Sequence, residues 1–158
     1  MWIIDFESYQ INSAFYPLEI CLLNTADQSK CFVYYVKYPC NYFNNLTTKY
    51  QFLTHGLTWG EGDETIYSAI SSILSKLGPK DVIYVKGLEK KRLVESWVAI
   101  DDDKCGVRVR EFPIISTPSL NRLVVCIEET CEKHKHLMVK ACARRKCFQL
   151  LRYLPILL

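Results

Sequence analysis

The chain lacks any run of apolar residues long enough to cross a membrane, and it contains no repeat, low-complexity segment or linker. Its first residues, Trp2-Ile3-Ile4-Asp5-Phe6, follow a strand pattern and already carry an acid, so we expect no signal peptide. Without a secretory signal, the eight cysteines are expected to be buried thiols or metal ligands. We therefore expect an intracellular protein, cytoplasmic or nuclear and not secreted, with no membrane association.

A strong charge of one sign is also missing, since the formal net charge is only +3 over 158 residues. The charge is uneven, however. Residues 1–80 hold 5 basic and 7 acidic side chains, a net of −2, and residues 81–158 hold 15 and 10, a net of +5. A basic half favours an acidic partner, most commonly nucleic acid, although an ordinary solvated surface gives the same balance. The length of 158 residues fits a single domain over residues 1–158, and the 49% hydrophobic content is enough for a packed core.

The pattern of apolar residues predicts an α/β fold with a mixed five-stranded sheet and helices on both faces. Strands are expected over 1–6, 18–24, 31–37, 81–85 and 107–110. Helices are expected over 61–77, with Glu61 to Glu64 in the first turn, over 88–97, briefly at 117–120, and from about 131 onward. Three strands in a meander followed by alternating helices and strands resemble the ribonuclease-H-like fold, which by itself does not give a function.

Three residues near the end of the chain have the spacing of metal ligands. Cys131 and His134 lie three positions apart, and Cys142 follows after seven intervening residues. Thiolates and imidazoles are the ligands that zinc prefers, and a closed structural zinc site needs a fourth. Three nearby residues could replace one of these ligands: Cys126, His136 and Cys147. Of these, His136 is the most serious alternative to His134.

Other polar side chains form candidate catalytic and binding groups. Asp5 and Glu7 are two positions apart on one strand, so both can point into one cleft, or they are a pair of acids at a strand end. Aromatic residues in the expected loop beside Asp5 could stack on bases or close the core: Tyr9, Phe15 and Tyr16. Two basic groups are candidates for phosphate contact on solvent faces, at a strand exit and on the last helix: Lys86, Lys90, Lys91, Arg92, Arg144, Arg145 and Lys146.

Several short segments resemble the DEDD-type 3′–5′ exonucleases. Asp5-Phe6-Glu7-Ser8 and Pro17-Leu18-Glu19-Ile20 resemble their opening strands, His55-Gly56-Leu57-Thr58 resembles a segment before their first long helix, and Ile83 to Gly87 matches their fourth strand. Within that superfamily the chain is most similar to the Maelstrom domain. This resemblance implies a structural zinc held by Glu19, at the start of the second strand, with Cys131, His134 and Cys142.

The chain departs from the exonuclease pattern where two further carboxylates are needed. Glu89 stands at the wrong place for the third acid, and the position of the fourth holds Ala141, or Val139 if counted from His134. Two carboxylates without these partners bind magnesium weakly. The resemblance thus implies a nuclease-derived nucleic-acid-binding module, with single-stranded RNA as the expected partner.

Two alternatives stay open. The first is an active ribonuclease or exonuclease that uses Asp5 and Glu7 with magnesium or manganese, or a non-standard site. The second is a scaffold for protein partners.

Overall fold

The five-stranded mixed sheet expected from the sequence is confirmed in the computed structural model, which describes residues 1–39, 51–52, 54–113, 129–134 and 141–154. The strand order is β3-β2-β1-β4-β5. The pairs β1–β2 and β2–β3 are antiparallel, and the pairs β1–β4 and β4–β5 are parallel. The strands are β1 Trp2–Ile11, β2 Ala14–Asn24, β3 Cys31–Tyr35, β4 Val82–Val85 and β5 Arg108–Glu111.

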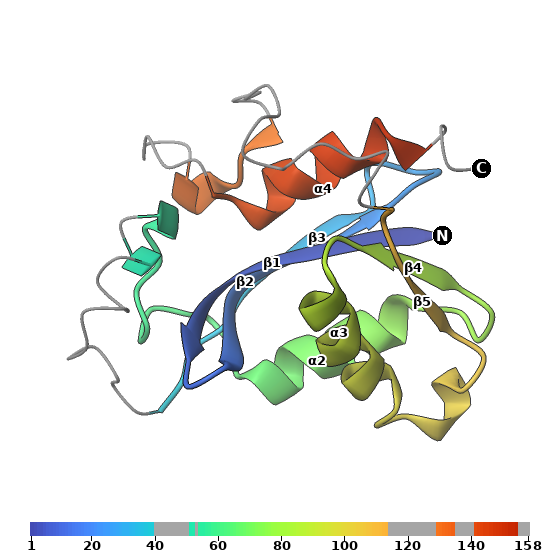
Figure 1. Ribbon diagram of the computed structural model, residues 1–158, viewed down its shortest axis with the longest axis horizontal. Helices are drawn as coiled ribbons and strands as arrows, with labels where there is room; N and C mark the ends of the chain where they lie inside the picture. The colour runs from blue at the N-terminus through green and yellow to red at the C-terminus, as the bar shows by residue number, and fades with distance from the viewer. Residues whose placement is uncertain (40–50, 53, 114–128, 135–140, 155–158) are drawn as a thin grey trace.

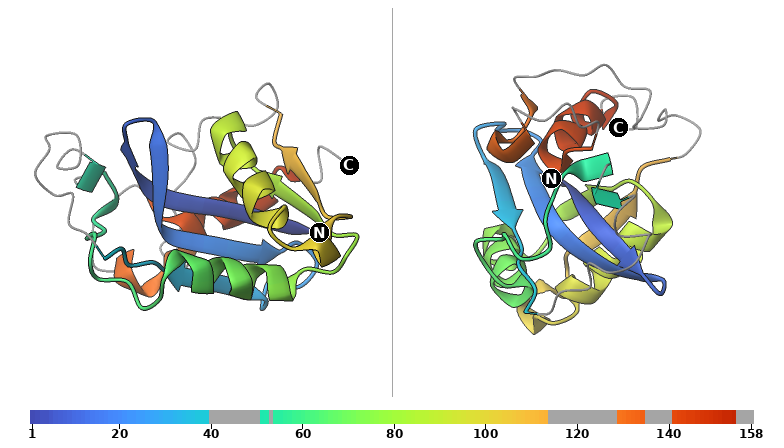
Figure 2. Two further views of the ribbon diagram at one scale, coloured as in Figure 1. Left: turned by 90° about the horizontal axis from the view of Figure 1, so that it is seen from below. Right: turned by 90° about the vertical axis from the view of Figure 1, so that its left-hand side faces the viewer.

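Helices cover both faces of this sheet, as Figures 1 and 2 show. The helices α2 Ile66–Lys76 and α3 Leu88–Val98 pack on one face against Ile4, Phe6 and Ile20. On the opposite face, α4 Ala143–Leu151 packs against Ile3, Cys21 and Leu23. Because both faces are covered, β1 and β2 read as continuous apolar runs rather than as alternating ones. Two short 3₁₀ helices, η1 Asp102–Lys104 and η4 Glu132–His134, complete the described elements.

The hairpin between β1 and β2 is longer than expected. Its strands continue to Ile11 and restart at Ala14, and Asn12 and Ser13 form the two-residue turn with φ of 50° and 66°. Two positive φ values are what a tight hairpin turn requires, and Asn adopts them readily. The expected loop at Tyr9, Phe15 and Tyr16 is therefore wrong, because all three lie in strands. The alternative that they close the core holds for Tyr9, which is fully buried.

The helix expected from Glu61 instead begins at Ile66, where the Thr65 side chain accepts a hydrogen bond from the Ser68 N–H and caps it. The acids at 61–64 are not in its first turn, so this part of the prediction is wrong. The preceding segment lies extended against the end of β3, where Asp63 and Glu64 donate backbone hydrogen bonds to the Tyr35 carbonyl. Gly62 permits this approach, since a Cβ there would lie 2.1 Å from the Val36 carbonyl carbon.

Two features of β1 and β2 position the candidate site. First, β1 pairs with β4 only over Trp2–Ile4, so it continues past the end of β4 toward the start of α3. Second, the register of β1 and β2 shifts between Glu7 and Ser8, because Leu18 is an extra residue between the partners Glu19 and Pro17. Such bulges re-aim side chains and are frequent beside functional sites.

Some predictions fall where the structure is not described. The short helix at 117–120 and the alternative ligands Cys126 and His136 lie outside the described residues. Among the described residues, no helix is both long enough and apolar enough to cross a membrane.

Candidate functional site

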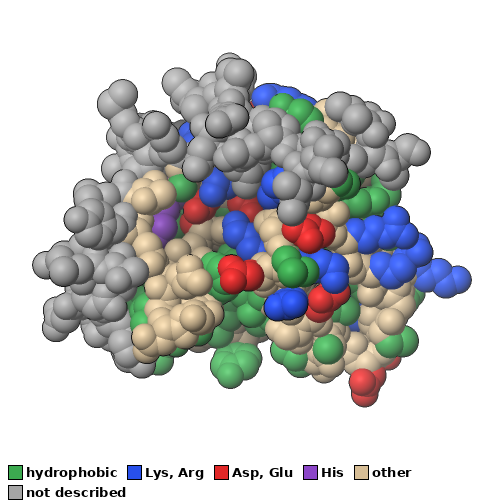
Figure 3. Space-filling model, in the orientation of Figure 1, with side chains coloured by type: hydrophobic (Ala, Val, Ile, Leu, Met, Phe, Trp, Pro, Cys, Tyr) green, Lys and Arg blue, Asp and Glu red, His purple; other side chains and the backbone are tan. Residues whose placement is uncertain are grey.

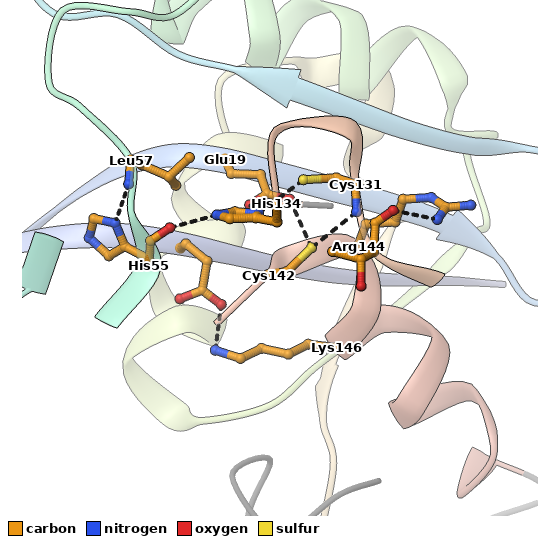
Figure 4. A network of polar contacts seen from close by, with 10 residues as sticks. Glu19, His55, Leu57, Cys131, His134, Cys142, Arg144 and Lys146 are labelled. Carbon is orange, nitrogen blue, oxygen red and sulfur yellow. Dashed lines mark hydrogen bonds and ion pairs between the residues drawn. The ribbon is translucent and has the colours of Figure 1, made fainter. Parts of the chain in front are cut away.

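Four buried side chains from distant parts of the chain converge on the face of the sheet that α4 covers (Figure 4). Glu19 comes from the middle of β2, not from its start as predicted, because β2 begins at Ala14. Cys131 precedes η4, His134 ends it, and Cys142 is the residue that caps α4. Their ligand atoms all lie within 4.8 Å of one another. We call these four residues the metal cluster, since such a group could hold a metal ion.

The distances within the metal cluster fit a tetrahedral ion. His134 Nδ1 lies 3.0 Å from Cys131 Sγ and 3.1 Å from Glu19 Oε2, and Cys142 Sγ lies 3.5 Å from Glu19 Oε1. Ordinary zinc bond lengths in a tetrahedron separate ligand atoms by about 3.4–3.8 Å. The four donors therefore need only small movements to surround an ion. Two sulfurs, one nitrogen and one carboxylate oxygen are also a donor set that zinc accepts.

A hydrogen bond to the backbone orients the histidine. His134 Nε2 lies 2.6 Å from the carbonyl oxygen of His55. A carbonyl can only accept, so Nε2 carries a hydrogen and Nδ1 faces the cluster, where it offers a lone pair to a metal once its own proton has left. This arrangement is the usual support for a metal-bound histidine. From the sequence, His55 belongs to the segment that resembles the exonucleases, and no role at the metal is predicted for it. The contact between His55 and His134 could not be predicted from the sequence, because it is made by the backbone carbonyl of His55 and depends only on the fold.

The electrostatics of the metal cluster favour a positive charge at its centre. Burial alone lowers the pKa of His134, but hydrogen bonds and charge interactions with Cys142 and Glu19 outweigh burial and raise it to about 10. Burial likewise acts to raise the pKa of Glu19, yet the hydrogen bond and charge of His134 hold it below its usual value. A proton or a metal ion is thus stabilised at the same point.

A second group of charges, which we call the charge cluster, lies beside the metal cluster. It consists of Asp5 and Glu7 on β1, Lys90 on α3 and Lys146 on α4. Lys90 Nζ lies 2.5 Å from Asp5 Oδ1, and Lys146 Nζ lies 2.5 Å from Glu7 Oε1. The Lys90 ammonium also donates to the Phe6 carbonyl at 2.7 Å. Each predicted catalytic acid is therefore neutralised by a lysine that was predicted to contact phosphate.

Both carboxylates of these ion pairs are shielded from water. Asp5 is fully buried and Glu7 nearly so. Burial raises the pKa of Glu7, as does Asp5, while Lys146 and Lys90 limit that rise. The carboxylates act in the opposite direction on Lys146, whose pKa is raised by Glu7 and Asp5 against the effect of burial. Both clusters are adjacent, because Glu7 and Glu19 are direct partners across β1 and β2.

The predicted solvent positions of the basic residues are wrong in part. Arg145 is buried, and the side chains of Lys90 and Lys146 are only 19% and 12% exposed. For Arg145 and Lys146 the physical reason is that α4 packs on the sheet, so successive residues around it cannot all face solvent. For Lys90 the reason is its contact with Asp5 and the Phe6 carbonyl. Arg92 is exposed, Lys86 and Arg144 are half-buried, and Lys91 forms an ion pair with Glu95. Figure 3 shows basic and acidic side chains intermixed near the middle of the face in view, and a group of basic side chains at its right-hand edge.

Cys147 does not join the metal cluster. Its sulfur lies 3.5 Å from the Cys21 carbonyl oxygen, and the residue is fully buried in the core beneath α4. Among the thiols that the structure describes, only Cys131 and Cys142 belong to the cluster. No family model, curated protein or solved structure matches this chain.

Proposed function

We propose that this chain is a ribonuclease-H-like domain, similar to the Maelstrom domain, that binds nucleic acid and has lost two-metal nuclease chemistry. The meander β1-β2-β3 followed by alternating helices and parallel strands supports the fold assignment. The convergence of Glu19, Cys131, His134 and Cys142 supports the likeness to the Maelstrom domain, whose zinc has this ligand set.

The metal in this proposal is zinc, and its role is structural. The four donors fill all tetrahedral positions, and an open catalytic zinc would keep one position for water. The cluster ties β2 to η4 and to the start of α4, three segments that are far apart in the sequence. Zinc bound there contributes directly to the stability of the fold.

The observation that carries the loss of catalysis is the pairing of both acids with lysines. A two-metal site needs several free carboxylates around hard divalent cations. Here the ammonium groups of Lys90 and Lys146 lie 2.5 Å from Asp5 and Glu7, where a cation would otherwise bind. Magnesium or manganese would have to displace two buried lysines, which would then lose their partners.

Nucleic-acid binding is the function that remains for such a domain, with single-stranded RNA as the partner. Lys86 follows β4, and Arg92 is exposed on α3, so both lie at the carboxyl end of the parallel strands where ligands gather in open sheets. Arg144 adds a third cation from the start of α4. The phosphate-contacting surface in this proposal is smaller than the sequence predicts, because Lys90, Lys91 and Lys146 form ion pairs and Arg145 is buried.

The test is a binding and cleavage assay on labelled single-stranded RNA, with zinc content measured on the same sample. We expect one zinc per chain, binding at low salt, and no cleavage with magnesium or manganese. Cleavage that requires manganese and disappears in Asp5→Asn would instead support the nuclease. Absence of binding to RNA or DNA at low salt would leave the protein-interaction scaffold.

A further inference from the structure

Two cysteines outside the metal cluster are in direct contact between neighbouring strands. Cys21 lies in β2 and Cys31 begins β3. Cys21 pairs with Val33 and Cys31 with Leu23, so the two cysteines are diagonal neighbours in the ladder. Their sulfur atoms are 3.6 Å apart. A disulfide needs about 2.05 Å, so the sulfurs must approach by about 1.5 Å.

The two thiols differ in access to solvent. Cys21 is fully buried, whereas Cys31 is half-buried. A small reagent dissolved in water therefore reaches Cys31 first. Arg144 also acts on Cys31. The hydrogen bond from Cys21 and the charge and hydrogen bond of Arg144 lower the pKa of Cys31 to about 7, although burial opposes them. A thiolate in contact with a cation and a second thiol is the environment of a reactive cysteine.

We propose that Cys31 and Cys21 form a peroxide-reactive pair, in which Cys31 is oxidised and Cys21 converts it to a disulfide between β2 and β3. This inference does not depend on nucleic-acid binding or on a bound metal. The structure supports it through the sulfur contact and the difference in exposure between the two thiols.

The chemistry takes two steps. The Cys31 thiolate attacks a hydroperoxide, an S–O bond forms, the O–O bond breaks, and the leaving oxygen takes a proton to become water or an alcohol. Cys31 is now a sulfenic acid, oxidised by two electrons, and the peroxide has been reduced. The Cys21 sulfur then attacks the Cys31 sulfur, the S–S bond forms, and the hydroxyl of Cys31 leaves as water with the Cys21 proton.

Cys147 is the third sulfur in this region and the natural rival for Cys21. Its thiol donates to the carbonyls of Ile3 and Cys21 rather than lying at the Cys31 sulfur. It is also fully buried on α4. We therefore expect Cys147 to stay reduced while the pair oxidises.

The experiment treats the full chain with hydrogen peroxide and maps its cysteines by protease digestion and mass spectrometry. In the wild type we expect a Cys21–Cys31 crosslink. In Cys21→Ser, Cys31 should accumulate as a sulfenic acid that dimedone traps, and Cys21→Ala serves as a second variant if the serine disturbs the buried site. Cys31→Ser should give neither product. Cys105→Ser is the matched control, because Cys105 is exposed and lies outside the pair. The yield of the Cys21–Cys31 crosslink in this variant should equal that of the wild type.

A substitution at Arg144 tests the environment of the thiolate. Arg144→Gln keeps a polar side chain but removes the cation, so sulfenic acid formation at Cys31 near pH 7 should slow by about fivefold as its thiolate fraction falls. The proposal fails if Cys105 oxidises before Cys31, if the crosslink joins Cys21 to Cys147, or if no crosslink forms at peroxide doses that oxidise Cys105.

Discussion

Lys146 occupies an unusual position for a lysine on a helix, because its ammonium is enclosed between the sheet and α4 beside Glu7. Burying an ion pair costs desolvation energy on both sides, so the pair itself adds little to stability compared with apolar residues of the same size. Removing one partner is different, since it leaves an unpaired charge inside the protein. The charge cluster therefore makes Glu7 and Lys146 depend on each other.

Lys146→Met should destabilise the fold by about 3–5 kcal/mol at pH 7, because Glu7 is then buried without its nearest cation. The loss should shrink as the pH falls. Burial already raises the pKa of Glu7, and without Lys146 it rises further, so the carboxylate takes up a proton and its charge disappears. Urea unfolding at pH 7 and pH 5 measures both effects. The double variant Glu7→Gln with Lys146→Met is the control and should recover much of the lost stability. Equal or greater instability of the double variant would contradict the pairing.

The metal cluster predicts that serine substitutions at two cysteines five residues apart, Cys142 and Cys147, have different effects on bound zinc. Cys142→Ser removes a ligand, so zinc content should fall from one per chain to well below one, and the melting temperature should fall with it. Cys147→Ser changes a fully buried thiol that donates to the carbonyls of Ile3 and Cys21 and is not one of the four clustered residues, so the variant should keep its zinc. Metal analysis of the two purified variants distinguishes the cases. Loss of zinc from both, or from neither, would count against the ligand assignment.

At the scale of elements, the β1–β2 hairpin carries the acids of both clusters, and its turn is a place where the sequence is not optimal. Ser13 holds a φ of 66°, in the left-handed region that costs a non-glycine residue energy. Asn-Gly is the preferred pair for such a turn. The stability of the hairpin thus retains room for improvement without any change in the site.

Ser13→Gly should stabilise the protein by about 0.5–1 kcal/mol, because relief of the left-handed strain exceeds the extra freedom of glycine in the unfolded chain. For a domain of this size the melting temperature should rise by about 1–4 °C. Ser71→Gly is the matched control: Ser71 is an exposed residue inside α2, where glycine lowers helix stability, so the same exchange should lower the melting temperature. Thermal unfolding of the wild type and the two variants measures these shifts. A change of melting temperature in the same direction for both variants would contradict the strained turn.

Local patterns predicted the elements well and their contacts less well. Strand patterns located β4 and β5 to within a residue or two, since β-branched runs and alternation are local signals. The start of α2 was predicted too early, because Gly62 and the acids around it are held by β3, a tertiary contact that composition does not reveal. The ligands Cys131, His134 and Cys142 share a readable spacing, whereas Glu19 was found only through a family resemblance. The lysine partners of Asp5 and Glu7 could not be predicted, because 85 residues separate Lys90 from Asp5.

For the whole molecule, the division of basic residues between the interior and the surface limits how strongly it can bind a polyanion. With Lys86, Arg92 and Arg144 as phosphate contacts, we expect a slope of about −2 in log affinity against log salt, at about −0.7 per contact on a single strand.

Arg92→Glu should make that slope shallower by about 0.7. Lys80→Glu is the matched control, because Lys80 is exposed but precedes β4, at the opposite end of the strand from Lys86. Fluorescence anisotropy with a labelled single-stranded RNA at several salt concentrations gives the slopes. Equal salt slopes for Arg92→Glu and Lys80→Glu would show that Arg92 does not contact the RNA.

The order in which the site becomes available during synthesis follows from its position in the sequence. Glu19 and Cys142 are 123 residues apart, so at ribosomal rates of about 5–20 residues per second the hairpin waits about 6–25 s for this ligand. During that time the hairpin carries three inward-facing acids, Asp5, Glu7 and Glu19, on one face without their lysine and thiol partners. A nascent β1–β2 hairpin is therefore poorly stable by itself, and stable folding must wait until α3 and α4 have emerged. In the proposed zinc site, the ion can therefore reach all four ligands only after the chain has been translated through Cys142.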